Sequence, residues 1–250
     1  MNSQLFNYLL QLGDNALILG HRLGEWCGHA PEMEIDMALT NIALDLTGQA
    51  RNLYQQAALI EGLGKTEDDI AYLRDAWDFR NVLLVEQPND DFAYTVVRQF
   101  FFDAFNYYLH RELTKSNDAW LAGFAEKSLK EITYHLRFSS EWMLRLGDGT
   151  ETSHQKLQTA LDELWMFSGE LTAPNATDTA MANDGIAPDL SMIKPLFDEK
   201  IKEVVTNATL KMPSGSWMQG GGKEGRHSEH LGYILADMQF LQRAYPGQEW

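Results

Sequence analysis

Leu44-Asp45-Leu46-Thr47-Gly48 places an acidic residue inside an apolar helical run, and the same combination recurs along the chain. Three other apolar runs with helical spacing each enclose one acid or imidazole, at Asp14, Asp103 and His135. Apolar residues that recur every three or four positions are typical of helices that bury one face. Asp14 and Asp45 are 31 residues apart and Asp103 and His135 are 32, spacings that can bring each pair to the same height in an antiparallel hairpin of long helices. Because an ionised carboxylate is costly to bury alone, these residues predict a helical bundle around a shared polar cavity.

Helical periodicity dominates the rest of the chain, and no segment has the alternation of a strand. Short connections after the first and third long patterns predict antiparallel hairpins, and the longer second connection predicts a crossover. We therefore expect an all-α fold in one domain, residues 1–250, with a four-helix core and additional C-terminal helices. The expected core helices span about 3–28, 32–62, 91–115 and 118–147, and the accessory helices about 153–171, 190–210 and 228–244.

Two connecting segments and one helix have distinctive compositions. Residues 66–78 are acidic and predict a short helix, whereas residues 172–189 are polar and contain two prolines, which predicts a loop. Six aromatic residues lie between positions 100 and 108, and they are spread too far round the helix to face one neighbour. This third helix must be buried on several sides, within the bundle or against another chain.

Charge and composition exclude several classes of function. The net charge of −16 argues against binding to nucleic acid or to an anionic membrane surface, since both require basic residues. No apolar run approaches the roughly 18 residues that span a bilayer. The N-terminus lacks the pattern of a signal peptide, and the single cysteine, Cys27, suits a reducing cytosol. We therefore expect a cytoplasmic protein.

The four polar positions resemble an incomplete metal site. Bundles that bind two iron or manganese ions carry one carboxylate on each of two helices and a Glu-x-x-His pair on each of the other two. Here Gly48 stands where a histidine would follow Asp45, and Ile132 stands where a glutamate would precede His135. Three interpretations stay open from the residues alone. The metal site is lost, it is altered, or a basic side chain closes a polar core, with His21, Arg22 and Arg137 as the candidates.

Two other stretches are candidate sites. Phe79-Arg80-Asn81 joins an aromatic residue, a cation and an amide, which indicates either a contact with an anionic substrate or partner chain, or a surface junction. His227-Ser228-Glu229-His230 has histidines close together, but Ser228 is a suitable N-cap with an acid in the first helical turn. The cap is the favoured interpretation. The glycines that precede Lys223 lack the spacing of a phosphate-binding loop.

Over essentially its whole length, the chain resembles the PaaC subunits of phenylacetyl-CoA 1,2-epoxidases, in the ferritin-like family of bacterial multicomponent monooxygenases. The stretches that carry the resemblance are Leu12–Pro31, Leu44–Arg51, Asn81–Asn89 and His227–Gly232. The resemblance implies a ferritin-like bundle and a non-catalytic subunit. It places Asp14, Asp45, Asp103 and His135 at ancestral ligand positions, as a vestigial polar core, with Gly48 and Ile132 at lost positions. It implies no catalytic residue and no metal in this chain.

The resemblance also implies partners. The di-iron centre belongs to a catalytic sister subunit, which uses O₂ to epoxidise the ring of phenylacetyl-CoA in aerobic phenylacetate catabolism. Further small subunits and an NADPH-dependent iron–sulfur flavin reductase complete the system, and phenylacetyl-CoA itself is expected at the edge of the chain. Two alternatives differ in class: a metal-dependent oxygenase with an altered ligand set, and a stand-alone acyl-CoA-binding helical module.

Overall fold

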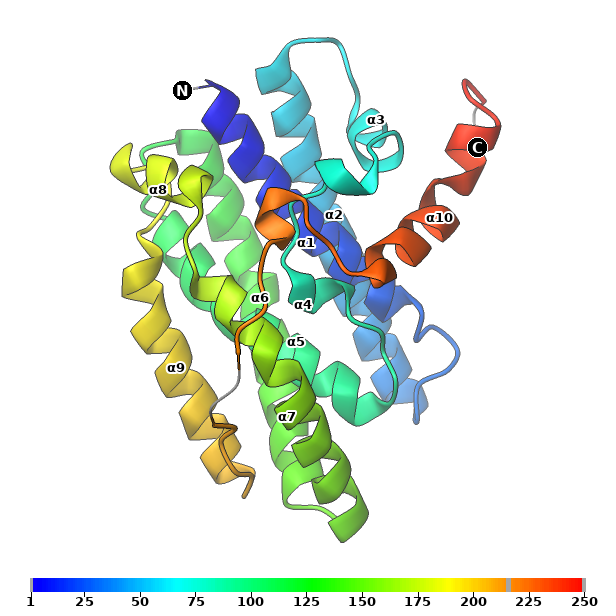
Figure 1. Ribbon diagram of the computed structural model, residues 1–250, viewed down its shortest axis with the longest axis vertical. Helices are drawn as coiled ribbons and strands as arrows, with labels where there is room; N and C mark the ends of the chain where they lie inside the picture. Colours follow the sequence, from blue (N-terminus) through cyan, green and yellow to red (C-terminus); the bar gives the residue numbers. More distant parts are fainter. Residues whose placement is uncertain (1, 215–216, 249–250) are drawn as a thin grey trace. The chain divides into compact units, whose positions relative to one another are not determined.

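The computed structural model describes residues 2–214 and 217–248, and every regular element within them is a helix (Figure 1). The all-α prediction is therefore confirmed. The chain divides into two compact units: unit 1 comprises Met1–Pro88 and Gly220–Trp250, and unit 2 comprises Asn89–Gln219. The organisation of residues 1–250 as one domain stays a prediction.

Unit 1 is built on an antiparallel pair, α1 (Asn2–Gly24) and α2 (Met33–Glu61). The two helices approach closely because Gly13 and Gly20 lie on the contacting face. A Cβ atom at Gly13 would lie 2.6 Å from the Tyr54 ring, and one at Gly20 would lie 3.3 Å from the carbonyl oxygen of Ala43. Leucine and isoleucine side chains with almost no solvent exposure fill the rest of this contact, including Leu9, Ile18, Leu19, Leu39, Ile42 and Leu46.

Short elements and a C-terminal helix complete unit 1. They are α3 (Glu67–Tyr72), η1 (Ala76–Asp78), α4 (Leu83–Glu86), η2 (Gly222–Glu224) and α10 (Glu229–Ala244). Helix α10 contacts α3, η1 and α4, which precede it by well over a hundred residues. Ser228 caps α10 by accepting a hydrogen bond from the backbone of His230, so the capping interpretation of this stretch is confirmed.

Unit 2 is organised around α5 (Phe92–Leu113), which contacts α6 (Ala119–Gly147), α7 (Glu151–Thr172) and α9 (Leu190–Asn207). This central position explains the aromatic residues spread round α5, since Phe100, Phe101 and Phe102 are all buried. Phe101 also packs edge-on against Trp165 of α7. The expected burial of the third helix on several sides is confirmed.

Two boundaries differ from the sequence-based expectation. The first helix ends at Gly24 rather than near residue 28, because residues 25–29 form turns. The predicted loop over 172–189 contains α8 (Ala176–Asn183), so the expectation of a continuous loop is wrong. The Asn175 side chain caps α8 in a reciprocal pair with Asp178, and Met181 is fully buried. With one buried apolar anchor, so short a helix has too weak a periodicity to recognise.

Candidate functional site

Asp14 lies opposite Tyr54 on the neighbouring helix, and this fixes the register of the α1–α2 pair. The Tyr54 hydroxyl donates to Asp14 Oδ1 at 2.5 Å. Asp45 lies nine residues before Tyr54, which is about 13 Å along a helix at 1.5 Å per residue. The expectation that Asp14 and Asp45 lie at the same height is therefore wrong. Eight residues separate α1 from α2, and this connection is not divided equally between the two helices. Each position in α1 therefore faces a position farther along α2 than an equal division would give.

Arg74, which follows α3, is the cation that neutralises Asp14. Its guanidinium donates to both carboxylate oxygens, with Nη1 3.1 Å from Oδ2 and Nη2 in close contact with Oδ1. The backbone N–H of Arg80 donates to Oδ2 at 2.7 Å. With Tyr54, these donors occupy all of the roughly four lone-pair positions of a carboxylate. The fully buried Asp14 is thus paired and hydrogen-bonded within unit 1.

Electrostatics agree with this pairing. Burial is the largest single effect on the pKa of Arg74 and would lower it, but Asp14, Tyr54 and Asp78 together outweigh burial and raise that pKa. Burial and the Asp14 carboxylate hold the pKa of Tyr54 well above its usual range. The guanidinium also lies 4.2 Å from the centre of the Phe79 ring, close enough for a cation–π interaction. Tyr54 therefore remains a neutral donor and Arg74 a cation at any physiological pH.

A second polar cluster fixes the C-terminal segment to the middle of unit 1. Glu86 is fully buried, and its Oε1 accepts from the backbone N–H of Ser228 at 2.7 Å. Its Oε2 accepts from Asn81 Nδ2 at 3.1 Å and lies 3.0 Å from Nδ1 of His227. The other ring nitrogen of His227 lies 3.0 Å from the carbonyl oxygen of Phe79. These contacts join residues 79–86 to the start of α10.

Backbone packing around Gly222 joins the same two segments. A Cβ atom at Gly222 would lie 2.2 Å from the carbonyl oxygen of Asn81 and 3.1 Å from the backbone nitrogen of Leu83. Glycine is required here for close approach, not for its dihedral freedom. The cluster therefore supports the backbone of Phe79 and Arg80, which in turn contacts Asp14.

Phe79-Arg80-Asn81 forms part of both clusters. The side chains of Phe79 and Asn81 are fully buried, whereas that of Arg80 is partly exposed and donates to the carbonyl oxygens of Trp77 and Phe79. The stretch is not the surface junction considered from the sequence, because its backbone anchors Asp14. A substrate or partner contact stays a prediction, and only Arg80 among the three offers any surface for it.

In unit 2, Asp103 and His135 lie close enough to interact. Both are fully buried, on α5 and α6. Gln99 Nε2 donates to Asp103 Oδ1 at 2.7 Å, and Ser139 Oγ donates to Oδ2 at 2.8 Å. Burial raises the pKa of Asp103 to about 6, against the opposing effects of His135, Ser139 and Gln99. For this pair, the spacing in the sequence did indicate proximity.

The raised pKa of Asp103 makes the stability of the protein depend on pH. Because the folded-state pKa lies above the ordinary value of 3.8, the folded state holds this proton more tightly. The contribution of Asp103 is then most favourable at low pH and is lost as the pH rises from about 4 to about 6. Replacing Asp103 by the isosteric asparagine removes this loss of stability. The pKa shift of Asp103 corresponds to a loss of about 3 kcal/mol.

We expect the difference in unfolding free energy, Asp103→Asn minus wild type, to increase between pH 4 and pH 6 and then to level off. Denaturant titrations at closely spaced pH values measure it. Ser139→Ala, which keeps the carboxyl group, is the matched control and should retain most of the wild-type pH dependence. Parallel profiles for wild type and Asp103→Asn would show that this carboxyl does not titrate with a raised pKa.

Comparison with known proteins identifies the group to which the chain is related. A family model described as phenylacetic acid catabolic protein matches residues 1–250. The chain belongs to this family. It is 50% identical over 248 residues to the PaaC component of the 1,2-phenylacetyl-CoA epoxidase of Escherichia coli strain K12, with 99% of this chain and 100% of the relative covered. The resemblance stated from the four sequence stretches is confirmed, as are the ferritin-like fold class and the place of a PaaC component in phenylacetate catabolism.

The residues of this phenylacetic acid catabolic family member do not fit a di-iron centre. Asp14 is saturated by Arg74, Tyr54 and Arg80, and Asp103 accepts from two side chains. Gly48 has no ligand atom, although open space would surround a side chain there. Ile132 is fully buried and apolar. Within residues 2–214 and 217–248, no group of three or more His, Cys, Asp or Glu is arranged to hold a metal ion.

Asp45 is placed differently from the other three polar residues. It is half-buried on α2, beside the exposed Leu44 and the exposed Gly48. Its position on the outer part of the helix makes it a candidate for contacts at the edge of a protein interface. Its assignment to a vestigial core with Asp14, Asp103 and His135 stays a prediction.

The sequence did not reveal Arg74, Tyr54 or Glu86 as members of the polar clusters. Arg74 lies in an acidic stretch without periodicity, and Tyr54 looks like any other apolar-face residue of α2. Glu86 offered one signal, since it follows the apolar run Val82–Val85 directly and lies two residues before Pro88. In the part of the chain that the structure describes, no helix is long and apolar enough to cross a membrane.

Proposed function

We propose that this chain is the non-catalytic structural subunit of a multicomponent 1,2-phenylacetyl-CoA epoxidase. It assembles with and stabilises the di-iron subunit that epoxidises the ring of phenylacetyl-CoA with O₂. The observation that carries the proposal is the commitment of Asp14 to four hydrogen bonds, including a salt bridge to Arg74. The family resemblance assigns this position to an ancestral metal ligand. The identity to the PaaC component of an epoxidase supports it.

In this proposal the iron of the partner supplies the oxygen chemistry, and this chain supplies a folded surface. A reductase with iron–sulfur and flavin groups delivers electrons from NADPH, and further small subunits complete the assembly. Phenylacetyl-CoA contacts this chain only at an edge. The complex acts in the cytoplasm, which suits a chain whose single cysteine, Cys27, is free and exposed.

The outer face of α2 is the surface that we assign to the catalytic subunit. Met33, Met37, Leu44 and Leu59 fall on one side of the helix, and each is more than half exposed. Leu59 has 76% of its surface accessible, although leucines on the opposite side of α2 are fully buried. A helix apolar on both sides requires a partner on each. Obligate interfaces are apolar at the core and usually bury more than about 2,000 Å².

Replacing Met37 and Leu59 by glutamate tests this surface. Because both side chains are exposed, we expect the free energy of unfolding to change by less than about 1 kcal/mol. Affinity for the catalytic subunit should fall at least tenfold, since two charges would have to be desolvated in an apolar contact. Met192→Glu on α9, also exposed, is the control. Biolayer interferometry with purified catalytic subunit measures the affinity, and an unchanged value would contradict the assignment.

Asp45→Ala separates the structural function from the alternative that this chain is itself an oxygenase. We expect altered stability or assembly, with turnover per assembled complex unchanged. Iron loading of the separately purified chain should leave far less than one metal ion per chain. Near-stoichiometric iron that is lost in Asp45→Ala and His135→Ala variants, or abolished turnover with normal assembly and stability, would overturn the proposal.

Calorimetry tests the other alternative, a stand-alone acyl-CoA-binding module. We expect no binding of phenylacetyl-CoA to the isolated chain in the micromolar range. Micromolar binding without the catalytic subunit would favour the module and require a ligand site within this chain.

A further inference from the structure

Helix α10 is packed on one side only. It contacts α3, η1 and α4, and Leu231, Ile234 and Leu235 are buried along it. Its other side exposes large apolar residues, and Phe240 has 63% of its surface accessible. Trp77 of η1, which is 75% exposed, adds an aromatic residue from a segment that contacts α10. Exposed apolar side chains that gather in one place mark an interaction surface more often than scattered ones do.

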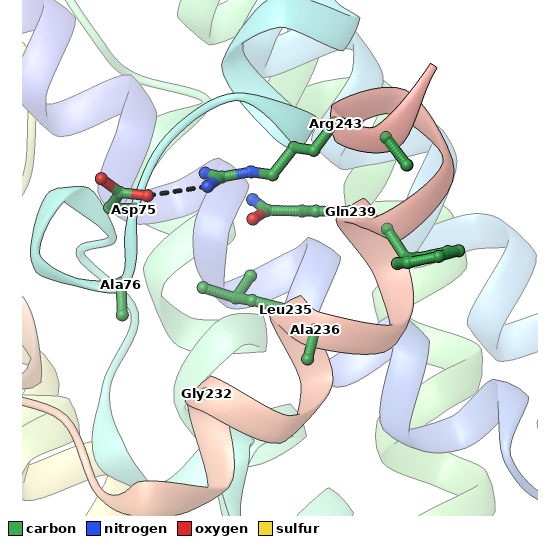
Figure 2. A pocket seen from close by; sticks show the side chains of 9 residues that line it. Asp75, Ala76, Gly232, Leu235, Ala236, Gln239 and Arg243 are labelled. Atoms are coloured by element: carbon green, nitrogen blue, oxygen red, sulfur yellow. Dashed lines mark hydrogen bonds and ion pairs between the residues drawn. The ribbon is translucent and has the colours of Figure 1, made fainter. Parts of the chain in front are cut away.

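A groove follows the exposed side of α10. Figure 2 shows its main hollow, between the helix and the segment that carries Asp75 and Ala76. This hollow has a volume of about 580 Å³, and a second one of about 240 Å³ shares Ala76 and Gly232 with it. The two hollows therefore lie next to each other, and together they form the groove. Gly232 and Ala236 make its floor shallow at successive turns of α10, so a second helix can approach the backbone closely.

Hydrogen bonds hold the walls of this groove in place. Gln239, only 4% exposed, donates to the carbonyl oxygens of Ala71 and Arg74 at 3.1 and 2.9 Å. Arg243 donates to the carbonyl oxygens of Tyr72 and Arg74 and pairs with Asp75 at 2.9 Å. These bonds fix α10 to the end of α3, so the groove exists before any partner binds. A preformed site loses little conformational entropy on binding.

The elements that form the groove carry exposed carboxylates. Asp75 and Glu229 line its two hollows, Asp78 ends η1, and Asp237 lies on the exposed side of α10. Arg243, the basic residue in the lining of the main hollow, already pairs with Asp75 and with carbonyl oxygens. The potential over the groove is therefore negative, which attracts and orients a basic partner.

We propose that this groove, the α10 groove, binds a basic amphipathic helix of another protein component of the same epoxidase. The inference rests on the proposed function and adds a second docking surface, separate from the α2 face. The apolar side of the incoming helix lies on Gly232, Ala236 and Phe240, and its basic residues meet the exposed carboxylates. A second copy of this chain is the poorer occupant. Asp237 lies within the exposed side, and each chain carries a net charge of −16.

The test uses the full chain with the substitutions Ala236→Arg and Asp237→Lys combined. Both positions are exposed, so the fold should tolerate them. The reductase and each small subunit, purified singly and fluorescently labelled, are titrated with the variant and with wild type at low and high salt. We expect one of them to bind the wild type more weakly at high salt, and to lose at least tenfold in affinity for the variant. Glu203→Lys, an exposed acid on α9, is the control.

Affinity for the catalytic subunit should be unchanged in the α10 variant, which distinguishes this inference from the α2 assignment. Unchanged binding of every component, or loss of the catalytic subunit, would overturn the inference. So would a wild-type dimer in sedimentation equilibrium that the variant dissociates, since the occupant would then be a second copy. If the double variant folds poorly, Phe240→Ser replaces it, because this is a single change at an exposed position. The same loss of affinity for the labelled component is then expected.

Discussion

Replacing Arg74 by methionine lowers the free energy of unfolding by about 3–5 kcal/mol, because it leaves the Asp14 carboxylate buried without a counter-charge. Asp14 is fully inaccessible to solvent, and Arg74 provides two of its hydrogen bonds. Methionine preserves much of the volume of the arginine stem, so the loss reports the guanidinium charge, including its cation–π contact with Phe79. Chemical denaturation followed by circular dichroism measures the difference.

Two further variants make this result interpretable. Arg51→Met removes an exposed ion pair with Glu67 and should change stability by less than about 1 kcal/mol. Adding Asp14→Asn to Arg74→Met removes the uncompensated charge, and we expect the double variant to recover part of the loss. A loss in Arg74→Met no larger than in Arg51→Met would mean that Asp14 is compensated in another way.

Replacing Glu86 by alanine should cost on the order of 3 kcal/mol, because several buried donors lose their acceptor together. The backbone N–H of Ser228, the side-chain amide of Asn81 and the ring of His227 all contact this carboxylate. We expect the C-terminal segment to separate from residues 79–86 more readily. Hydrogen exchange should therefore accelerate in α10 and in residues 79–86, before any change in unit 2.

Glu203→Ala, which removes an exposed carboxylate that pairs with Lys200, serves as the control for the loss of a negative charge. It should leave both stability and hydrogen exchange near wild-type values. Uniform acceleration of exchange throughout the chain in Glu86→Ala would argue that this carboxylate supports global stability, and not the attachment of α10 in particular.

The long helices were predictable because their information is local. Apolar spacing, capping residues and terminating glycines all act within a few turns of chain, and the predicted ranges 32–62 and 118–147 correspond to α2 at Met33–Glu61 and α6 at Ala119–Gly147. The proximity of Asp103 and His135 was also predictable, since a short turn joins α5 and α6. Where the connection was longer, as between α1 and α2, the register inferred for Asp14 and Asp45 was wrong.

The sequence by itself determined an all-α chain of the phenylacetic acid catabolic family and the absence of ligand side chains at Gly48 and Ile132, because residue identity and helical period suffice for both. Only the tertiary structure decided what compensates the buried carboxylates. Arg74 lies 60 residues from Asp14, and His227 lies 141 residues from Glu86. The energy of a buried charge depends on what surrounds it in space, and no local pattern specifies a partner at that separation.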